Sequence, residues 1–265
     1  MIGEPGQTQY DLKFNLFGFP VRVHPGFFLI SVLFGQGAIS LGNDLGLNAG
    51  VSLLVIIVVF FLSILIHELG HTFAFRLYGV SSSVCLYWMG GLAIPSNFNR
   101  RSLTSNQQIV VSLAGPIFGL LFGGVLVGIV YAVGGSVEFH PPNLTGERKN
   151  LFPALLPNFL AVPEFVRRYP PLVIFLSSGL YINIFWNVMN LVPVYPLDGG
   201  QIAREIYLQF NSRNGIQNSL MLSLFAGAGI AILALMSQDT FIALLFGYLA
   251  YMSYMSLQRM NGQRW

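Results

Sequence analysis

The chain has 265 residues, of which 54% are hydrophobic and only 9% carry a charged side chain. A soluble globular domain has about 25% charged residues, so this composition excludes an ordinary soluble protein and indicates an integral membrane protein of several spans. The net charge of +3 comes from basic residues scattered singly or in pairs, which argues against a nucleic-acid partner. The lone cysteine, Cys85, excludes an internal disulfide and a cysteine-based zinc site.

Six apolar segments are long enough to be candidates for membrane spans. They are predicted at residues 26–41, 51–78, 109–133, 172–194, 218–236 and 241–257. Residues 13–24 alternate in polarity and residues 83–95 contain a glycine pair, so both are predicted to be extended. The expected fold is an all-α polytopic membrane protein of about six transmembrane helices, with a small membrane-associated β-hairpin or sheet near the N-terminus and after the second helix.

The longest predicted connection, residues 134–171, contains several prolines that argue against a spanning helix. No connection is long enough for a second soluble domain, so residues 1–265 are expected to form a single membrane-embedded domain. If the N-terminus is cytoplasmic, most lysines and arginines fall on the cytoplasmic side of the membrane, as such residues usually do. The C-terminus is then cytoplasmic as well. The second span then runs inward, and its last third lies in the cytoplasmic half of the membrane.

That second span ends in the motif His67-Glu68-Leu69-Gly70-His71. Ionisable groups at membrane depth are costly, so they indicate a functional site. Positions i and i+4 share a helix face, so His67 and His71 are able to bind one metal ion together. Glu68 is rotated by about 100° from His67, where it can reach a metal-bound water without being a ligand. This is the HExxH arrangement of zinc peptidases.

A catalytic zinc ion takes three protein ligands and keeps one position for water. Asp198 is the favoured third ligand, because Pro193 and Pro196 break the fourth span just before it and Gly199-Gly200 is expected to let the backbone turn. Irregular backbone at membrane depth is tolerated only where it is buried in protein or lines a wet cavity, which is typical of a functional site. The other candidates are His24, His140 and Glu205.

The HELGH motif on one apolar segment, followed on a later one by the motif NLVPVYPLDGG at residues 190–200, resembles the site-2 protease family of intramembrane zinc metalloproteases. Weaker similarities at residues 17–25 and 114–116 extend the resemblance over residues 17–201. The resemblance implies one Zn²⁺ per chain, held by His67, His71 and Asp198, with Glu68 as the general base. It also implies that Asn190 stabilises the intermediate or positions the substrate, and that Gly90 and Gly91 belong to a strand that pairs with unwound substrate.

The implied activity is that of a zinc metalloendopeptidase, which hydrolyses peptide bonds within or near the transmembrane segment of membrane-protein substrates in regulated intramembrane proteolysis. By the same resemblance, the partners are single-span transmembrane proteins of the anti-sigma-factor or precursor type and the lipid bilayer. The resemblance also implies a location in a bacterial plasma membrane. Larger family members carry a PDZ or a CBS domain, and neither is expected here.

Two other functions stay open. A membrane transporter for metal or another solute also has broken helices and intramembrane polar groups, although two related halves are typical of that class. A non-catalytic relative that only binds membrane partners would have no need of Glu68. The roles of three asparagines are open as well, since the spacing of Asn183, Asn187 and Asn190 puts them on one helix face that could line a water path. The alternative for Asn183 and Asn187, which the sequence favours, is hydrogen bonding between helices. The alternative for Asn190 is a hydrogen bond to the carbonyl groups freed near Pro193.

Overall fold

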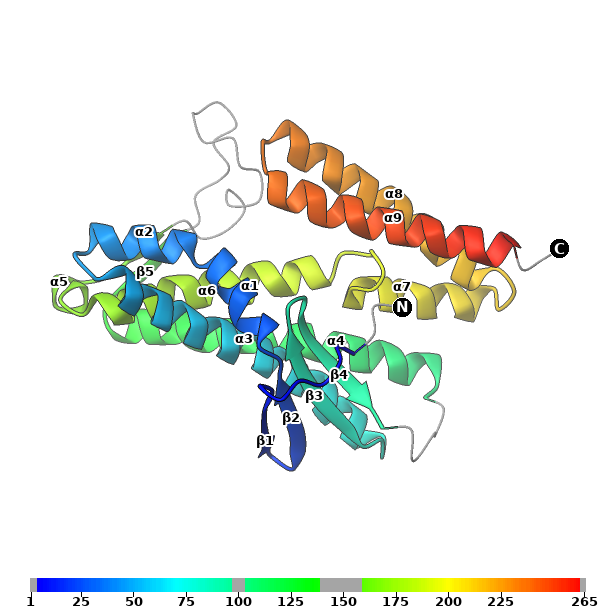
Figure 1. Cartoon of the computed structure of the whole chain (residues 1–265), viewed down its shortest axis with the longest axis horizontal. Coiled ribbons are helices and arrows are strands. Elements are labelled where there is room, and N and C mark those ends of the chain that lie inside the picture. The colour runs from blue at the N-terminus through cyan, green and yellow to red at the C-terminus, as the bar shows by residue number, and fades with distance from the viewer. Residues whose placement is uncertain (1–3, 97–102, 139–158, 263–265) are drawn as a thin grey trace. The chain divides into compact units, whose positions relative to one another are not determined.

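The computed structural model describes residues 4–96, 103–138 and 159–262, and the chain divides into two compact units (Figure 1). The first unit contains the described residues of Met1–Ser102, Ile117–Glu138 and Phe159–Asn187. The second contains the described residues of Leu103–Pro116 and Val188–Trp265. Each unit is built mainly of helices.

A four-stranded sheet lies in the first unit, in the order β1-β2-β3-β4 (Figure 1). Its strands are β1 (Leu12–Leu16), β2 (Phe19–Val23), β3 (Ser82–Tyr87) and β4 (Gly90–Pro95). The first two and the last two form antiparallel hairpins, and β2 pairs with β3 in parallel. The small β-hairpin or sheet predicted from residues 13–24 and 83–95 is therefore confirmed, and the structure shows that it is a mixed sheet.

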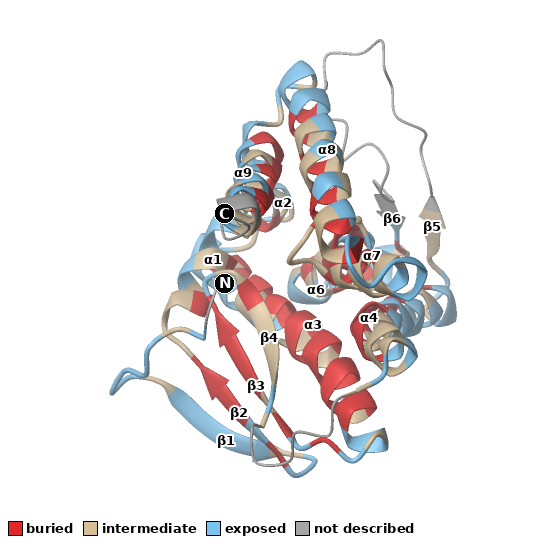
Figure 2. Cartoon of the chain, turned by 90° about the vertical axis from the view of Figure 1, so that its right-hand side faces the viewer, coloured by how far each residue is buried: buried red, intermediate tan, exposed pale blue. Residues whose placement is uncertain are grey.

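The sheet packs against the long helix α3 (Ala49–Leu77). Figure 2 shows that β2 and β3 are buried, whereas β1 is exposed and β4 is intermediate, so the two middle strands are the most buried part of the sheet. Val21 of β2 and Leu86 of β3 share a hydrophobic core with Phe60 and Ile64 of α3. The helix begins at a side-chain cap, in which Asn48 Oδ1 accepts a hydrogen bond from the amide of Gly50. This packing holds the last turns of α3 beside β3 and β4.

Five described helices are long and apolar enough to cross a membrane. They are α3, α4 (Ser105–Ala132), α6 (Pro170–Asn190), α8 (Gly215–Met236) and α9 (Thr240–Gly262). The predicted first span is instead a pair of short helices, α1 (Gly26–Phe34) and α2 (Gln36–Asp44), which are bent by 53°. A Cβ atom on Gly35, at the junction, would lie 2.9 Å from Ile56 of α3, so this close approach requires a glycine. The described spans number five, or six if the bent pair counts as one.

Several elements were not expected from the sequence. The predicted connection at residues 134–171 contains an antiparallel pair, β5 (Ser136–Glu138) with β6 (Phe159–Ala161), and a short helix α5 (Glu164–Arg167). The remainder of that connection, with His140, lies outside the described residues. In the second unit, α7 (Asp198–Phe210) begins directly after the irregular segment that follows α6. Within that unit α8 packs against both α7 and α9.

Candidate metal centre

The two histidines of the HExxH motif lie on one face of α3, as their spacing requires. Their Nε2 atoms are 3.1 Å apart, and the side chains are almost completely buried in the protein. Two nitrogen ligands of a tetrahedral zinc ion, each bonded at about 2.05 Å, are separated by roughly 3.3 Å. The observed separation therefore fits a pair of imidazoles that share one zinc ion. The geometry of α3 and the packing around it are sufficient to hold the two rings at this separation.

The buried asparagines of α6 join the two helices. His67 Nδ1 lies 2.7 Å from Asn187 Oδ1, and Asn183 Nδ2 donates to Ser63 Oγ of α3 at 2.8 Å. Both asparagines are about 1% exposed. Of the two roles left open by the sequence, hydrogen bonding between helices is the one found for Asn183 and Asn187. Asn190, one turn further on, is also buried and is the last residue of α6.

The Glu68 carboxylate lies against the main chain of β4. A Cβ atom on Gly91 would be 2.4 Å from Glu68 Oε1, so only a glycine lets the strand pass so closely. Gly90 has a φ of +106°, and a Cβ atom there would lie 2.5 Å from the Trp186 ring. The structure thus brings Gly91 next to Glu68 of the HExxH motif and Gly90 next to Trp186 of α6. The role of these two glycines in substrate binding stays a prediction.

Asp198 is the first residue of α7, in the second unit, and it is buried. The chain reaches it through an irregular segment that contains Pro193 and Pro196, so the predicted helix break is observed, beginning after Asn190. A carboxylate at this position also lies at the N-terminus of a helix, where the backbone dipole favours negative charge.

The expected reason for Gly199-Gly200 is wrong. Both glycines belong to the first turn of α7, and neither has a positive φ. A Cβ atom on Gly199 would lie 2.1 Å from the main-chain oxygen of Leu191, and one on Gly200 would lie 2.4 Å from the main-chain nitrogen of Tyr195. The glycines are therefore required because α7 begins in contact with the segment that precedes it, and not because the backbone turns freely.

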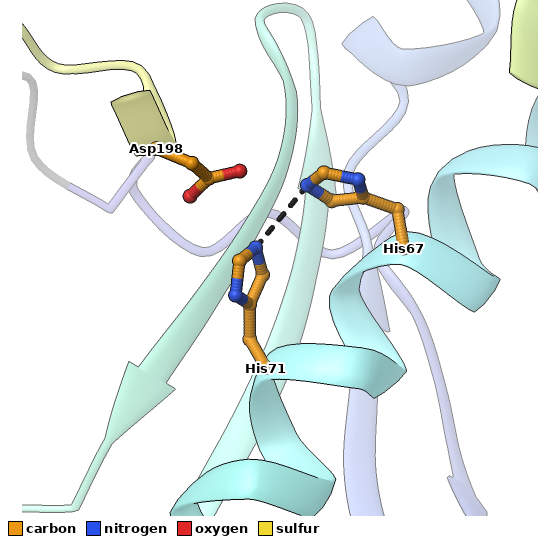
Figure 3. A group of neighbouring side chains, drawn as sticks. All are labelled: His67, His71 and Asp198. Carbon is orange, nitrogen blue, oxygen red and sulfur yellow. Dashed lines mark hydrogen bonds between the residues drawn. The ribbon is translucent and has the colours of Figure 1, made fainter. Parts of the chain in front are cut away.

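The three predicted ligands, His67, His71 and Asp198, are all buried, and Figure 3 draws their side chains. Two imidazole nitrogens and a carboxylate oxygen are a donor set that suits zinc. Of the other candidates, His24 Nδ1 accepts a hydrogen bond from the amide of Gly26 at 3.0 Å, which is a structural contact at the start of α1. Glu205 is a half-buried residue of α7.

Sequence reasoning did not identify Asn187 as a neighbour of the metal site. The spacing of the asparagines put three amides on one face of α6, but it did not distinguish which of them meets a histidine. The sequence feature that could have indicated a close contact at Asn187 is Gly119, since a Cβ atom there would lie 2.2 Å from Asn187 Nδ2. A glycine in an apolar helix indicates a close approach, but its partner is known only from the packing.

The family model for Peptidase family M50 matches residues 55–235. The chain is 24% identical over 229 residues to a zinc metalloprotease of Methanocaldococcus jannaschii, an alignment that covers 86% of this chain and 53% of the relative. It is 29% identical over 213 residues to a protein of Synechocystis sp., provisionally named a zinc metalloprotease, covering 76% of this chain and 46% of that protein. The chain thus spans about half the length of these relatives.

The structure is similar to that of the Site-2 Protease from Methanocaldococcus jannaschii, with a TM-score of 0.53 and 20% sequence identity. The similarity covers 94% of this chain and 95% of that one. At this identity the likeness establishes a shared fold, and the predicted arrangement of several membrane-spanning helices with a small sheet agrees with it.

Proposed function

Because this chain belongs to peptidase family M50, as its resemblance to the site-2 protease family predicted, we propose that it is an intramembrane zinc metalloprotease. Its reaction is the hydrolysis of peptide bonds within or near the transmembrane segments of membrane proteins. One observation carries the proposal: the last turns of α3 hold two imidazoles at the spacing of shared zinc ligands, with the buried Glu68 carboxylate beside them.

The proposed metal is one Zn²⁺ per chain. Its ligands are His67 Nε2, His71 Nε2 and the carboxylate of Asp198, which leaves one position for water. When bound, zinc supplies a water whose pKa is lowered to about 7 and a Lewis acid for the scissile carbonyl. The expected result for Asp198→Asn is a large loss of bound zinc, measured by elemental analysis of purified protein. Full zinc content in that variant would remove Asp198 from the ligand set.

Glu68 is the proposed general base. Its carboxylate takes a proton from the attacking water and delivers it to the leaving amine. The side chain is only 5% exposed, so the protein keeps bulk water away from the reacting groups. Asn190 offers an amide donor that is proposed to stabilise the oxyanion of the tetrahedral intermediate.

The proposed substrates are single-span transmembrane proteins of the anti-sigma-factor or precursor type. A transmembrane helix must unwind before its peptide bonds are accessible, and an extended segment pairs readily with the edge of a sheet. β4 is the last strand of the four-stranded sheet, and Gly91 brings it against Glu68. Pairing of substrate with β4 would therefore deliver a peptide bond to the general base.

We further propose that both termini are cytoplasmic and that the site lies in the cytoplasmic half of a bacterial plasma membrane. The distribution of lysine and arginine along the chain supports this orientation. Reporter fusions at the two ends of the full chain test it, since both are expected to be active only as cytoplasmic fusions. An active periplasmic reporter at either end would contradict the orientation.

The test of the function is cleavage of a panel of single-span reporters in detergent by wild type, Glu68→Gln and Glu205→Gln. Glu205→Gln is the matched control, because it removes a half-buried carboxylate that the mechanism does not use. Wild type and the control are expected to cleave, whereas Glu68→Gln is expected to bind zinc without cleaving. Cleavage by Glu68→Gln would refute the mechanism, and zinc binding without any cleavage by wild type would favour the transporter or the non-catalytic alternative.

A further inference from the structure

We propose that Asn187 is a positioning residue that fixes the tautomer and ring orientation of His67, so that the Nε2 atom of this histidine faces the metal. The inference rests on the proposed zinc site and adds a residue outside the ligand set. All the residues that carry it belong to the first unit of the chain.

The orientation of the Asn187 amide follows from its two partners. Its Nδ2 atom donates to the main-chain carbonyl of Asn183, a group that only accepts hydrogen bonds. The other end of the amide, Oδ1, therefore faces His67 and lies 2.7 Å from Nδ1. Since an amide oxygen also only accepts, Nδ1 carries the hydrogen and Nε2 keeps its lone pair. That is the tautomer in which Nε2 binds a metal.

The Asn187 amide is buried next to other hydrogen-bonded side chains. Asn187 and His67 are 1% and 2% exposed, so water does not compete for the hydrogen bond. One turn earlier, Asn183 Nδ2 donates to Ser63 Oγ of α3 at 2.8 Å and to the carbonyl of Gly179 at 2.8 Å. The contact with Ser63 ties α6 to α3 one turn from the histidine, and the contact with Gly179 lies within α6. A fixed second partner of this kind orients metal-binding imidazoles in many metal sites.

Gly119 of α4 leaves the space that the amide occupies. A Cβ atom on Gly119 would lie 2.2 Å from Asn187 Nδ2 and 2.4 Å from Oδ1. The atoms in its way are the far end of a flexible side chain, so Gly119→Ala is expected to displace the amide while the helices stay folded. Gly123, one turn further along α4, is the matched control, because its nearest contact would be an ordinary 3.5 Å to Asn183 Cβ.

The test measures the zinc dissociation constant of the full chain in detergent, by competition with a chelator. Asn187→Leu and Gly119→Ala are expected to weaken zinc binding by about 10- to 100-fold, the usual effect of losing the second partner of a ligating histidine. Asn187→Asp keeps an acceptor for Nδ1 and is expected to bind zinc within about threefold of wild type. Gly123→Ala is expected to match wild type.

A second readout separates positioning from mere stabilisation. The visible absorption of the Co²⁺-substituted protein reports the ligands directly, so it is expected to change in Asn187→Leu and Gly119→Ala and to be restored in Asn187→Asp. Unfolding temperatures are measured on the same samples. Asn187→Leu and Gly119→Ala could instead be less stable yet keep wild-type zinc affinity and an unchanged Co²⁺ spectrum. That result would overturn this inference and leave the proposed function intact. A wild-type protein that binds no zinc would overturn the proposed function as well.

Discussion

Replacing Gly91 with alanine tests whether the position of the Glu68 carboxylate controls catalysis. The new Cβ atom would lie 2.4 Å from Glu68 Oε1, whereas ordinary contact begins at 3.4 Å, so the difference is 1.0 Å. The strand cannot easily retreat, because Gly91 is paired with Leu86 within the β3–β4 hairpin. The flexible glutamate is therefore expected to withdraw by about 1 Å, a displacement that typically costs about 10²-fold in rate.

The assay is the cleavage rate of a single-span reporter by Gly91→Ala, with zinc content measured on the same sample. Zinc is expected to stay bound, since the substitution displaces the base and not the ligands, and the loss is expected in kcat. Gly124→Ala serves as the control, because a Cβ atom on Gly124 meets nothing within 4 Å. A Gly91→Ala protein that cleaves at the wild-type rate would refute the assignment of Glu68 as a positioned general base.

Three further substitutions or reactions test the packing. Gly199→Ala places a Cβ atom 2.1 Å from a main-chain oxygen, and overpacking of this kind costs about 1–3 kcal/mol of folding free energy. A lower unfolding temperature is expected, together with weaker zinc binding, because Gly199 follows the proposed ligand Asp198 directly. Burial raises the pKa of the Cys85 thiol to about 11, so at pH 8 iodoacetamide should label the folded protein at least about tenfold more slowly than the unfolded protein; equal rates would contradict the burial. Gly42→Ala would place a Cβ atom 2.0 Å from Ser52 Oγ, and Ser52→Ala is expected to restore part of the lost stability.

The membrane helices were predictable because their signals are local. Residues 51–66 form an almost uninterrupted apolar run that continues into the HExxH motif, and the observed helix α3 is Ala49–Leu77. The extended segments were likewise indicated by the alternating polarity of residues 13–24 and by the Gly90-Gly91 pair. Residues 13–24 were expected as one extended segment, whereas β1 and β2 form a hairpin with a turn at Phe17-Gly18. Within α3, helix periodicity alone was enough to bring His67 and His71 to one face.

The features that the sequence did not predict depend on contacts between distant segments. The bend between α1 and α2 lies where Gly35 meets Ile56 of α3, a contact invisible in the run of residues 26–41. The glycines at the start of α7 are needed because the main chain of residue 191 passes close to Gly199. The sequence alone had suggested, wrongly, that they let the backbone turn. The meeting of Asn187 with His67 joins residues 120 positions apart and follows only from the packing of α6 beside α3.

Activity as a function of added zinc tests the central claim most directly. Wild-type protein is stripped with a chelator, zinc is added back in fractions of one equivalent per chain, and cleavage of a single-span reporter is followed. Activity is expected to be absent without metal, to rise in proportion to added zinc and to level off at about one zinc ion per chain, as a single catalytic site requires. Cleavage that persists in the stripped protein would contradict the assignment of the His67–His71 pair to a catalytic zinc ion.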